Sequence, residues 1–327
     1  MIESILAVLP PGLRRIVDKL PGTVSSRTEE LRIRQGRPLE IVYGGSYAFI
    51  GADGLLTDNP AAAYRPDKED AVKLLELLTN HSVYSFEEEL KRGFITVAGG
   101  HRVGLAGRTV LEQGKVKQIR DITSFNIRIA REIREASREV LPYLLDSSGT
   151  AMHHTLVISP PQHGKNDTDQ GFGKKLVLWQ MAGCQGGARG FKVGVVDERS
   201  EIAACDKGVP RFDLGPRTDV LDGCPKAEGM MMMIRSLSPE VIVVDEIGRA
   251  EDAGAIHEAV RAGIRVLATA HGSGLEDVKR RPVLQALLED GMFTRYIVLE
   301  RRKGGNPFFA VLDGKGTRLE AARNGVY

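Results

Sequence analysis

Short apolar runs recur through the second half of the chain. They are rich in β-branched side chains and cover residues 155–158, 192–196, 241–244, 266–269 and 296–299. Continuous runs of this kind are typical of parallel strands that are buried on both faces of a sheet. Helical patterns lie between them, for example EDAGAIHEAVRA at residues 251–262. The alternation of strands and helices predicts a doubly wound α/β domain.

The first half of the chain has clear helical patterns of its own. Apolar residues at helical spacing predict one helix within residues 1–20 and a second over residues 68–80, which Asp67 would cap. A third helix is expected over residues 132–146, and the following Ser147-Ser148-Gly149 has the composition of a linker. These helices are interleaved with segments of a different period.

The segments between these helices have the patterns of β-strands and of a β-hairpin. Residues 30–34 and 39–43 alternate polar and apolar side chains, which is typical of strands with one buried face. Residues 94–130 have the pattern of a long β-hairpin. We therefore expect a smaller α+β domain over residues 1–147 and the α/β domain over residues 148–327.

The composition narrows the class of protein. Hydrophobic residues make up 42% of the 327 residues and charged residues 27%, which is typical of a folded globular chain. No apolar run approaches the ~20 residues that span a bilayer, and the N-terminus does not resemble a signal peptide. Three cysteines without metal-ligand spacing fit a reducing cytosol. These features argue against a disordered, a disulfide-built or an integral membrane protein.

Two adjacent carboxylates follow a buried strand of the predicted α/β domain. Residues 241–244 end in Asp245 and Glu246, and ligands of open α/β sheets bind at the carboxyl ends of the strands. One carboxylate can orient a hydrated Mg²⁺, while the other points at water in line with a γ-phosphate. The alternative is a pair of acids that caps the next helix.

A candidate phosphate-binding loop follows the first strand of the same domain. Ser159-Pro-Pro-Gln-His-Gly164-Lys165 comes directly after residues 155–158. In a P-loop, backbone N–H groups cradle the phosphates and the lysine reaches the β- and γ-oxygens. The match is imperfect, because Ser159 replaces the first glycine and Asn166 replaces the Mg²⁺-binding hydroxyl. Alone, this segment also fits a surface turn. The P-loop interpretation therefore depends on the second signal, the strand that ends in Asp245-Glu246.

Long segments resemble one known family. These are GFITVAGGHRVGLAGR (93–108), SFNIRIARE (124–132), KVGVVDERSEIAA (192–204), residues 213–249 and ATAHG (268–272). They are similar to the stage III sporulation protein AA family, which is related to the type II and type IV secretion ATPases. The resemblance implies a RecA-like P-loop ATPase domain and a smaller N-terminal α+β domain. It further implies a homo-hexamer that uses ATP and Mg²⁺ and energises a membrane-embedded sporulation channel. The location implied is the cytoplasmic face of the mother-cell membrane.

The resemblance also implies roles for individual residues. Lys165 would contact the β- and γ-phosphates, Asp245 would hold Mg²⁺ through water, and Glu246 would polarise the attacking water. His271 stands where related ATPases sense the γ-phosphate, although a strand-end histidine satisfied by the backbone is the alternative. The nucleotide-binding residues would be Ser159, Pro160, Pro161, Gln162, His163, Gly164, Lys165, Asn166 and Asp167.

Charged side chains elsewhere give weaker indications. Asp197-Glu198-Arg199 ends another buried strand and suits the same site, or else forms a salt-bridged loop. Relatives also contribute arginines of the first domain to a nucleotide. The candidates here are Arg102, Arg108, Arg128 and Arg131, each of which also fits a solvated strand face, and Arg128 is the one we select as a catalytic candidate.

Residues 166–189 depart from the family. They read NDTDQGFGKKLVLWQMAGCQGGAR, where the family continues with threonines and a helix. Codons allowed for residues 160–174, read one base later, can spell PPSMGKTTLIRDLAR, which is a complete P-loop. We hypothesise that two compensating frameshifts bracket residues 161–187. For the chain as it stands, Asn166 predicts weak ATP binding and poor hydrolysis.

Two other functions compete with the ATPase. One is a hexameric scaffold that keeps the fold but has lost hydrolysis. The other is a nucleic-acid motor. The balance of 45 Lys and Arg against 43 Asp and Glu, and an aromatic content of 6%, argue against binding of nucleic acid. An oxidoreductase has little support, because no G-x-G-x-x-G follows a first strand.

Overall fold

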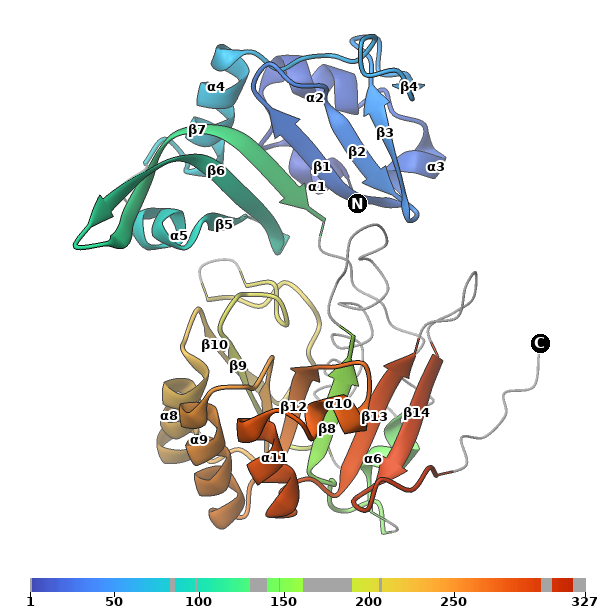
Figure 1. Ribbon diagram of the computed structural model, residues 1–327, viewed down its shortest axis with the longest axis vertical. Helices are drawn as coiled ribbons and strands as arrows, with labels where there is room; N and C mark the ends of the chain where they lie inside the picture. The colour runs from blue at the N-terminus through green and yellow to red at the C-terminus, as the bar shows by residue number, and fades with distance from the viewer. Residues whose placement is uncertain are drawn as a thin grey trace. The chain divides into compact units, whose positions relative to one another are not determined.

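The chain folds as two compact units. The computed structural model describes residues 2–82, 86–97, 99–129, 140–146, 148–160, 190–205, 208–300 and 308–319. The units are Met1–Arg131 and Glu132–Tyr327 (Figure 1). The division therefore falls before the expected boundary at residues 147/148. Helix α6 (Leu141–Leu144) explains the difference, because Val140 and Leu144 are buried in the core of the second unit.

A seven-stranded antiparallel sheet forms the first unit. Its strand order is β4-β3-β2-β1-β7-β6-β5. The predicted strands at 30–34 and 39–43 and the hairpin at 94–130 are present. The strands are β1 (Thr28–Arg34), β2 (Glu40–Tyr43), β3 (Ser46–Ile50), β4 (Leu56–Thr57), β5 (Phe94–Val97), β6 (His101–Glu112) and β7 (Lys115–Arg128).

One face of this sheet packs against helices. Alternate side chains such as Leu31 and Ile33 on β1, and Phe125 and Ile127 on β7, are buried in a single core. This is the expected result of period-two patterning on strands with one buried face. The helices of the unit are α1 (Glu3–Leu6), α2 (Pro11–Val17), α3 (Gly22–Ser25), α4 (Lys68–Leu78) and α5 (Glu87–Arg92).

The helix ends follow local chemistry. The helix expected within residues 1–20 is confirmed as α2, whose buried side chains are Leu13, Ile16 and Val17. The four-residue helix α1 precedes it, and Pro10 and Pro11 lack the N–H groups that would join the two into one helix. Helix α4 and its cap are confirmed. The Asp67 carboxylate accepts the backbone N–H of Asp70 at 2.9 Å, and the Asp70 carboxylate accepts the backbone N–H of Asp67 at 3.2 Å.

The opposite face of the first sheet carries charged side chains. Arg32 pairs with Glu30 at 2.8 Å, and Arg34 pairs with Glu40 on the neighbouring strand. The four side chains are between 12% and 41% exposed, so this face is partly open to solvent. Pairing along β1 and between β1 and β2 lets these charges occupy the sheet without a large desolvation penalty.

A second seven-stranded sheet forms the other unit, and it is mainly parallel. Its order is β10-β9-β11-β12-β8-β13-β14, and only the β13/β14 pair is antiparallel. The five predicted runs are all strands. The strands are β8 (Thr155–Ser159), β9 (Val193–Asp197), β10 (Thr218–Asp222), β11 (Val241–Val244), β12 (Arg265–His271), β13 (Arg295–Glu300) and β14 (Phe308–Asp313).

Two separate cores cover the two faces of this sheet. On β11, Ile242 and Val244 lie in one core, while Val241 and Val243 lie in the other. This explains why the strands read as continuous apolar runs. The helices are α8 (Lys226–Ser236), α9 (Ala250–Arg261), α10 (Leu275–Val278) and α11 (Pro282–Glu289), besides α6. Every helix in the described part of the chain is too short or too polar to cross a membrane.

Candidate functional site

The carboxyl ends of three parallel strands bring polar side chains to one edge of the second sheet. Val244 of β11 pairs with Val196 of β9 and with Ala268 of β12. The next residues, Asp245, Asp197 and Thr269, are therefore neighbours across the strands. As expected from the sequence, the acids gather where ligands of open α/β sheets bind.

Thr269 fixes the turn that follows β11. Its buried hydroxyl accepts the backbone N–H of Glu246 at 2.8 Å and donates to a carboxylate oxygen of Asp245. The backbone carbonyl of Thr269 accepts the N–H of Ile247 at 2.9 Å. Glu246 has a φ of +51°, in the left-handed region that costs energy for a residue with a Cβ. The contacts to Thr269 hold this unfavourable backbone in place, as is common at functional sites.

The Glu246 carboxylate is bound on both sides. One oxygen lies 2.8 Å from Nε2 of His271, at the end of β12, and the other accepts from Nη1 of Arg199 at 2.8 Å. His271 therefore contacts a carboxylate, rather than being satisfied by the backbone alone. The acids after β11 also do more than cap α9, because Asp252 fills that role by accepting the N–H groups of Gly248 and Arg249.

Asp197 organises the loop that follows β9. Its carboxylate is 1% exposed and accepts the backbone N–H groups of Glu201, Ile202 and Ala203, each at 2.8 Å. Burial raises the pKa of the Asp197 carboxyl to about 6, the N–H donors oppose this shift, and the charge of Asp245 adds to it. The loop is therefore folded back over the edge of the sheet around a buried carboxylate.

The folded-back loop adds a third acid to the site. Carboxylate oxygens of Glu201, Asp245 and Glu246 all lie within 4.8 Å of one another. Carboxylate oxygens suit a hard divalent cation such as Mg²⁺, which proteins usually hold through one or two carboxylates. Sequence reasoning missed Glu201, and its only sequence signal is its position four residues after Asp197, the last residue of β9. The donor set therefore fits the metal that the resemblance implies.

The candidate phosphate-binding strand lies beside this edge. Ser159 ends β8 and is paired with His271 of β12, and its backbone carbonyl accepts the N–H of Gly272 at 2.8 Å. Its hydroxyl is buried and, within the part of the chain that the structure describes, has no hydrogen-bond partner. An unpaired buried donor is consistent with a site that a ligand completes. Pro160 follows at the edge.

The remaining predicted residues are distributed as follows. Residues 161–189, including Lys165, Asn166 and the proposed frameshift segment, lie outside the described residues, and so does Arg131. Arg128 ends β7 in the first unit, where its guanidinium lies 3.8 Å from Glu30. Arg108 forms an exposed ion pair with Asp121 at 2.9 Å. The guanidinium of Arg102 lies 3.7 Å from the centre of the Phe94 ring.

Comparison with known proteins identifies the family. The family model for sporulation stage III, protein AA, matches residues 2–319. The chain belongs to this family. Stage III sporulation protein AA of Bacillus subtilis (strain 168) is 43% identical over 324 residues, which cover 97% of each chain. The family predicted from the sequence is therefore confirmed.

Solved structures confirm the fold. The ATPase DotB of Legionella pneumophila is similar with a TM-score of 0.56 and 14% identity, covering 88% of this chain and 77% of that one. The pilus retraction motor PilT with bound ADP has a TM-score of 0.51 and 13% identity, covering 87% and 78%. This member of the protein AA family thus has the secretion-ATPase fold: a mainly parallel α/β unit preceded by an antiparallel one.

Proposed function

We propose that the chain is an ATP-hydrolysing motor of a sporulation channel. The observation that carries this proposal is the placement of Asp245 and Glu246 at the carboxyl edge after β11, with only β12 between β11 and β8, the strand that leads to Gly164-Lys165. The fold shared with proteins described as an ATPase and as a pilus retraction motor supports it. Nucleotide phosphates would lie over the edge between β8 and β11.

Each residue at the edge has a task in this reaction. Asp245 and Glu201 would hold Mg²⁺, which when bound neutralises charge that develops on the phosphates. Glu246 would accept a hydrogen bond from the attacking water and orient it. Thr269 keeps Asp245 and Glu246 in register, and Asp197 keeps Glu201 over the edge. Lys165 would contact the β- and γ-oxygens.

The remaining expectations concern assembly. We propose a homo-hexamer at the cytoplasmic face of the membrane, docked on channel proteins, in which Arg128 of the first unit reaches a nucleotide in trans. A trans arginine stabilises charge in the transition state for phosphoryl transfer. The family membership and the fold support this assembly.

Asn166 favours a second candidate, an inactive scaffold with the same fold. An asparagine lacks the hydroxyl that coordinates Mg²⁺ in a P-loop, so binding of Mg-ATP would be weak. The frameshift hypothesis bears on the same segment. Sequencing of the gene across codons 155–192 tests it, and codons that cannot yield Gly-Lys-Thr-Thr one base later would refute it.

Titration calorimetry with Mg-ATP and a turnover assay on the full chain test both candidates. Asn166→Thr should raise affinity and turnover above those of the original chain, and adding Glu246→Gln should lower turnover by about 10²-fold or more while binding is kept. Glu251→Gln, an exposed acid on the first turn of α9, is the matched control and should change neither. Binding with no turnover in any variant would favour the scaffold. Absence of both would refute the ATPase.

A further inference from the structure

The two contacts of Glu246 bear on its availability as a water-orienting group. Arg199 binds one carboxylate oxygen and His271 approaches the other, each at 2.8 Å. A carboxylate that accepts a hydrogen bond from a guanidinium is stabilised in its ionised form and becomes a poorer acceptor for water. Glu246 is therefore held by protein groups.

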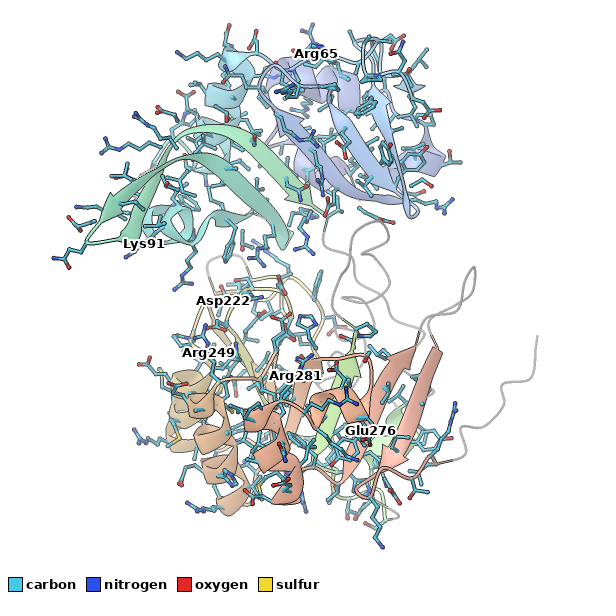
Figure 2. The ribbon with its side chains drawn as sticks, viewed as in Figure 1. Arg65, Lys91, Asp222, Arg249, Glu276 and Arg281 are labelled. Atoms are coloured by element: carbon cyan, nitrogen blue, oxygen red, sulfur yellow. The ribbon has the colours of Figure 1, made fainter. Side chains whose placement is uncertain are left out.

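Arg199 is placed for this contact by an ordered turn. Its neighbour Glu198 pairs with the buried Lys226 of α8, and its other neighbour Ser200 donates to Asp222 at the end of β10. Asp222 is labelled in Figure 2, at the end of the second unit where the strands from β9 to β12 also finish. Ser200 has a φ of +53°, so the turn is specific and not extended chain. The Arg199 side chain thus projects from a turn that is fixed on both sides.

Both groups that hold Glu246 are attractive to an anion. Arg199 is a permanent cation, and a histidine ring N–H can donate to a phosphate oxygen. Their side chains are 46% and 36% exposed, so an incoming ligand can reach them, whereas the Glu246 side chain is only 21% exposed. A terminal phosphoryl group carries more negative charge than one carboxylate and competes for the guanidinium.

We propose that Arg199 is a positioning residue that, with His271, latches Glu246 in the nucleotide-free state. The terminal phosphoryl group of a bound nucleoside triphosphate draws Arg199 away and frees Glu246 to orient water. This inference rests on the proposed ATPase activity. It adds to that activity a control: hydrolysis begins only after the triphosphate has displaced the latch.

A double-mutant cycle of Arg199→Gln and Glu246→Gln tests the latch without requiring turnover. Unfolding of the full chain in urea is measured with no nucleotide and again with saturating Mg²⁺ and a non-hydrolysable ATP analogue. Without nucleotide, the cycle should show a coupling of about twofold to fivefold in the unfolding equilibrium constant. With the analogue bound, the coupling should vanish. Arg235→Gln, an exposed arginine on α8, replaces Arg199→Gln in a control cycle and should show no coupling with Glu246→Gln.

A kinetic measurement separates a latch from a phosphate contact. In the chain carrying Asn166→Thr, Arg199→Gln should raise kcat about threefold to fivefold and leave the KM for ATP unchanged. Arg199→Lys keeps the charge, so its kcat should lie between that of the Asn166→Thr chain and that of the chain that also carries Arg199→Gln. A higher KM with a lower kcat would overturn the latch and make Arg199 a ligand of the nucleotide.

The outcomes distinguish this inference from the proposed function. No coupling in the nucleotide-free cycle, or coupling that persists with bound analogue, would overturn the latch even if ATP is hydrolysed. Coupling without nucleotide, together with no binding of Mg-ATP by any variant, would refute the proposed function and leave the resting contact of Arg199 and Glu246 established.

Discussion

The two seven-stranded sheets place their polar side chains in opposite ways. The antiparallel sheet buries one face and carries paired charges such as Arg34 and Glu40 along the strands of the other. The mainly parallel sheet buries both faces, so polar groups such as Asp245 and Thr269 gather at the strand ends. A paired charge such as Arg34 or Glu40 on the open face of the first sheet is therefore a partly exposed surface group, whereas Asp245 of the second sheet lies at the strand ends, where ligands of α/β sheets bind.

A lysine introduced into one strand of each sheet should have the largest effect on this comparison. Val243 of β11 is fully buried, and Tyr47 of β3 is 58% exposed. Val243→Lys should cost more than about 4 kcal/mol, because an unpaired ammonium is buried between two cores, and Tyr47→Lys should cost under about 1 kcal/mol. Urea unfolding followed by circular dichroism measures both. Similar costs would contradict the difference between the sheets.

Adding a methyl group at a strand glycine tests how closely each face is covered. A Cβ at Gly194 of β9 would lie 3.0 Å from the sulfur of Met233 on α8, whereas at Gly104 of β6 the nearest atom is 3.9 Å away. Gly194→Ala should cost about 1 to 2 kcal/mol by overpacking, and Gly104→Ala should be neutral or stabilise by about 0.5 kcal/mol. Thermal unfolding measures this pair, and a larger cost at Gly104 would refute the assignment of the open face.

Acid should weaken the amino end of the parallel sheet. Burial first, and then the charge of Arg265, lowers the pKa of His154 to about 4, and its ring contacts Arg265 and the Val266 N–H. Because the folded state favours the neutral ring, this contribution is complete above about pH 6.5 and is lost as the pH falls towards 4. The free energy of unfolding should fall by about 1 kcal/mol over this pH range. Urea unfolding at several pH values should show that the free energy of unfolding depends less on pH in His154→Gln than in the original chain. An unchanged pH dependence would contradict this role of His154.

The smallest effect is expected for the charged face of the first sheet. A double-mutant cycle of Arg34→Ala and Glu40→Ala should give a coupling of about 0.2 to 1 kcal/mol, because the pair is partly exposed. The coupling should shrink when salt is added. A coupling above about 3 kcal/mol would show that this face is as dependent on its charges as the edge of the second sheet.

Much of the second sheet could be predicted from the sequence, because burial on both faces produces unbroken apolar runs. Residues 241–244 match β11, and the other four runs lie within a residue or two of their strands. Strands β10 and β14 were missed. Strand β10 reads Thr-Asp-Val-Leu-Asp and lies at the edge of the sheet, so partial exposure removes the apolar signal. Strand β14 pairs antiparallel with β13 and breaks the β-α alternation.

The candidate site was predictable only where a residue directly follows a strand. Asp245 and Glu246 were found in this way, whereas the family resemblance pointed to His271, the last residue of β12. Glu201 and Thr269 were missed for different reasons. Glu201 reaches the edge because the buried Asp197 carboxylate folds its loop back, which depends on tertiary contacts. Thr269 looks like an ordinary β-branched strand residue, and its hydroxyl gains a role only when Glu246 turns over it.

At Glu246, the residue that best suits the left-handed backbone differs from the residue that the proposed reaction needs. Glycine would suit a φ of +51° better by about 1 kcal/mol, so the glutamate persists there at a cost to the turn. A library of variants sorted only for thermal resistance should therefore accumulate glycine or asparagine at this position. The same library sorted for consumption of nucleotide should return glutamate, so the substituents recovered at this one site report which property was selected.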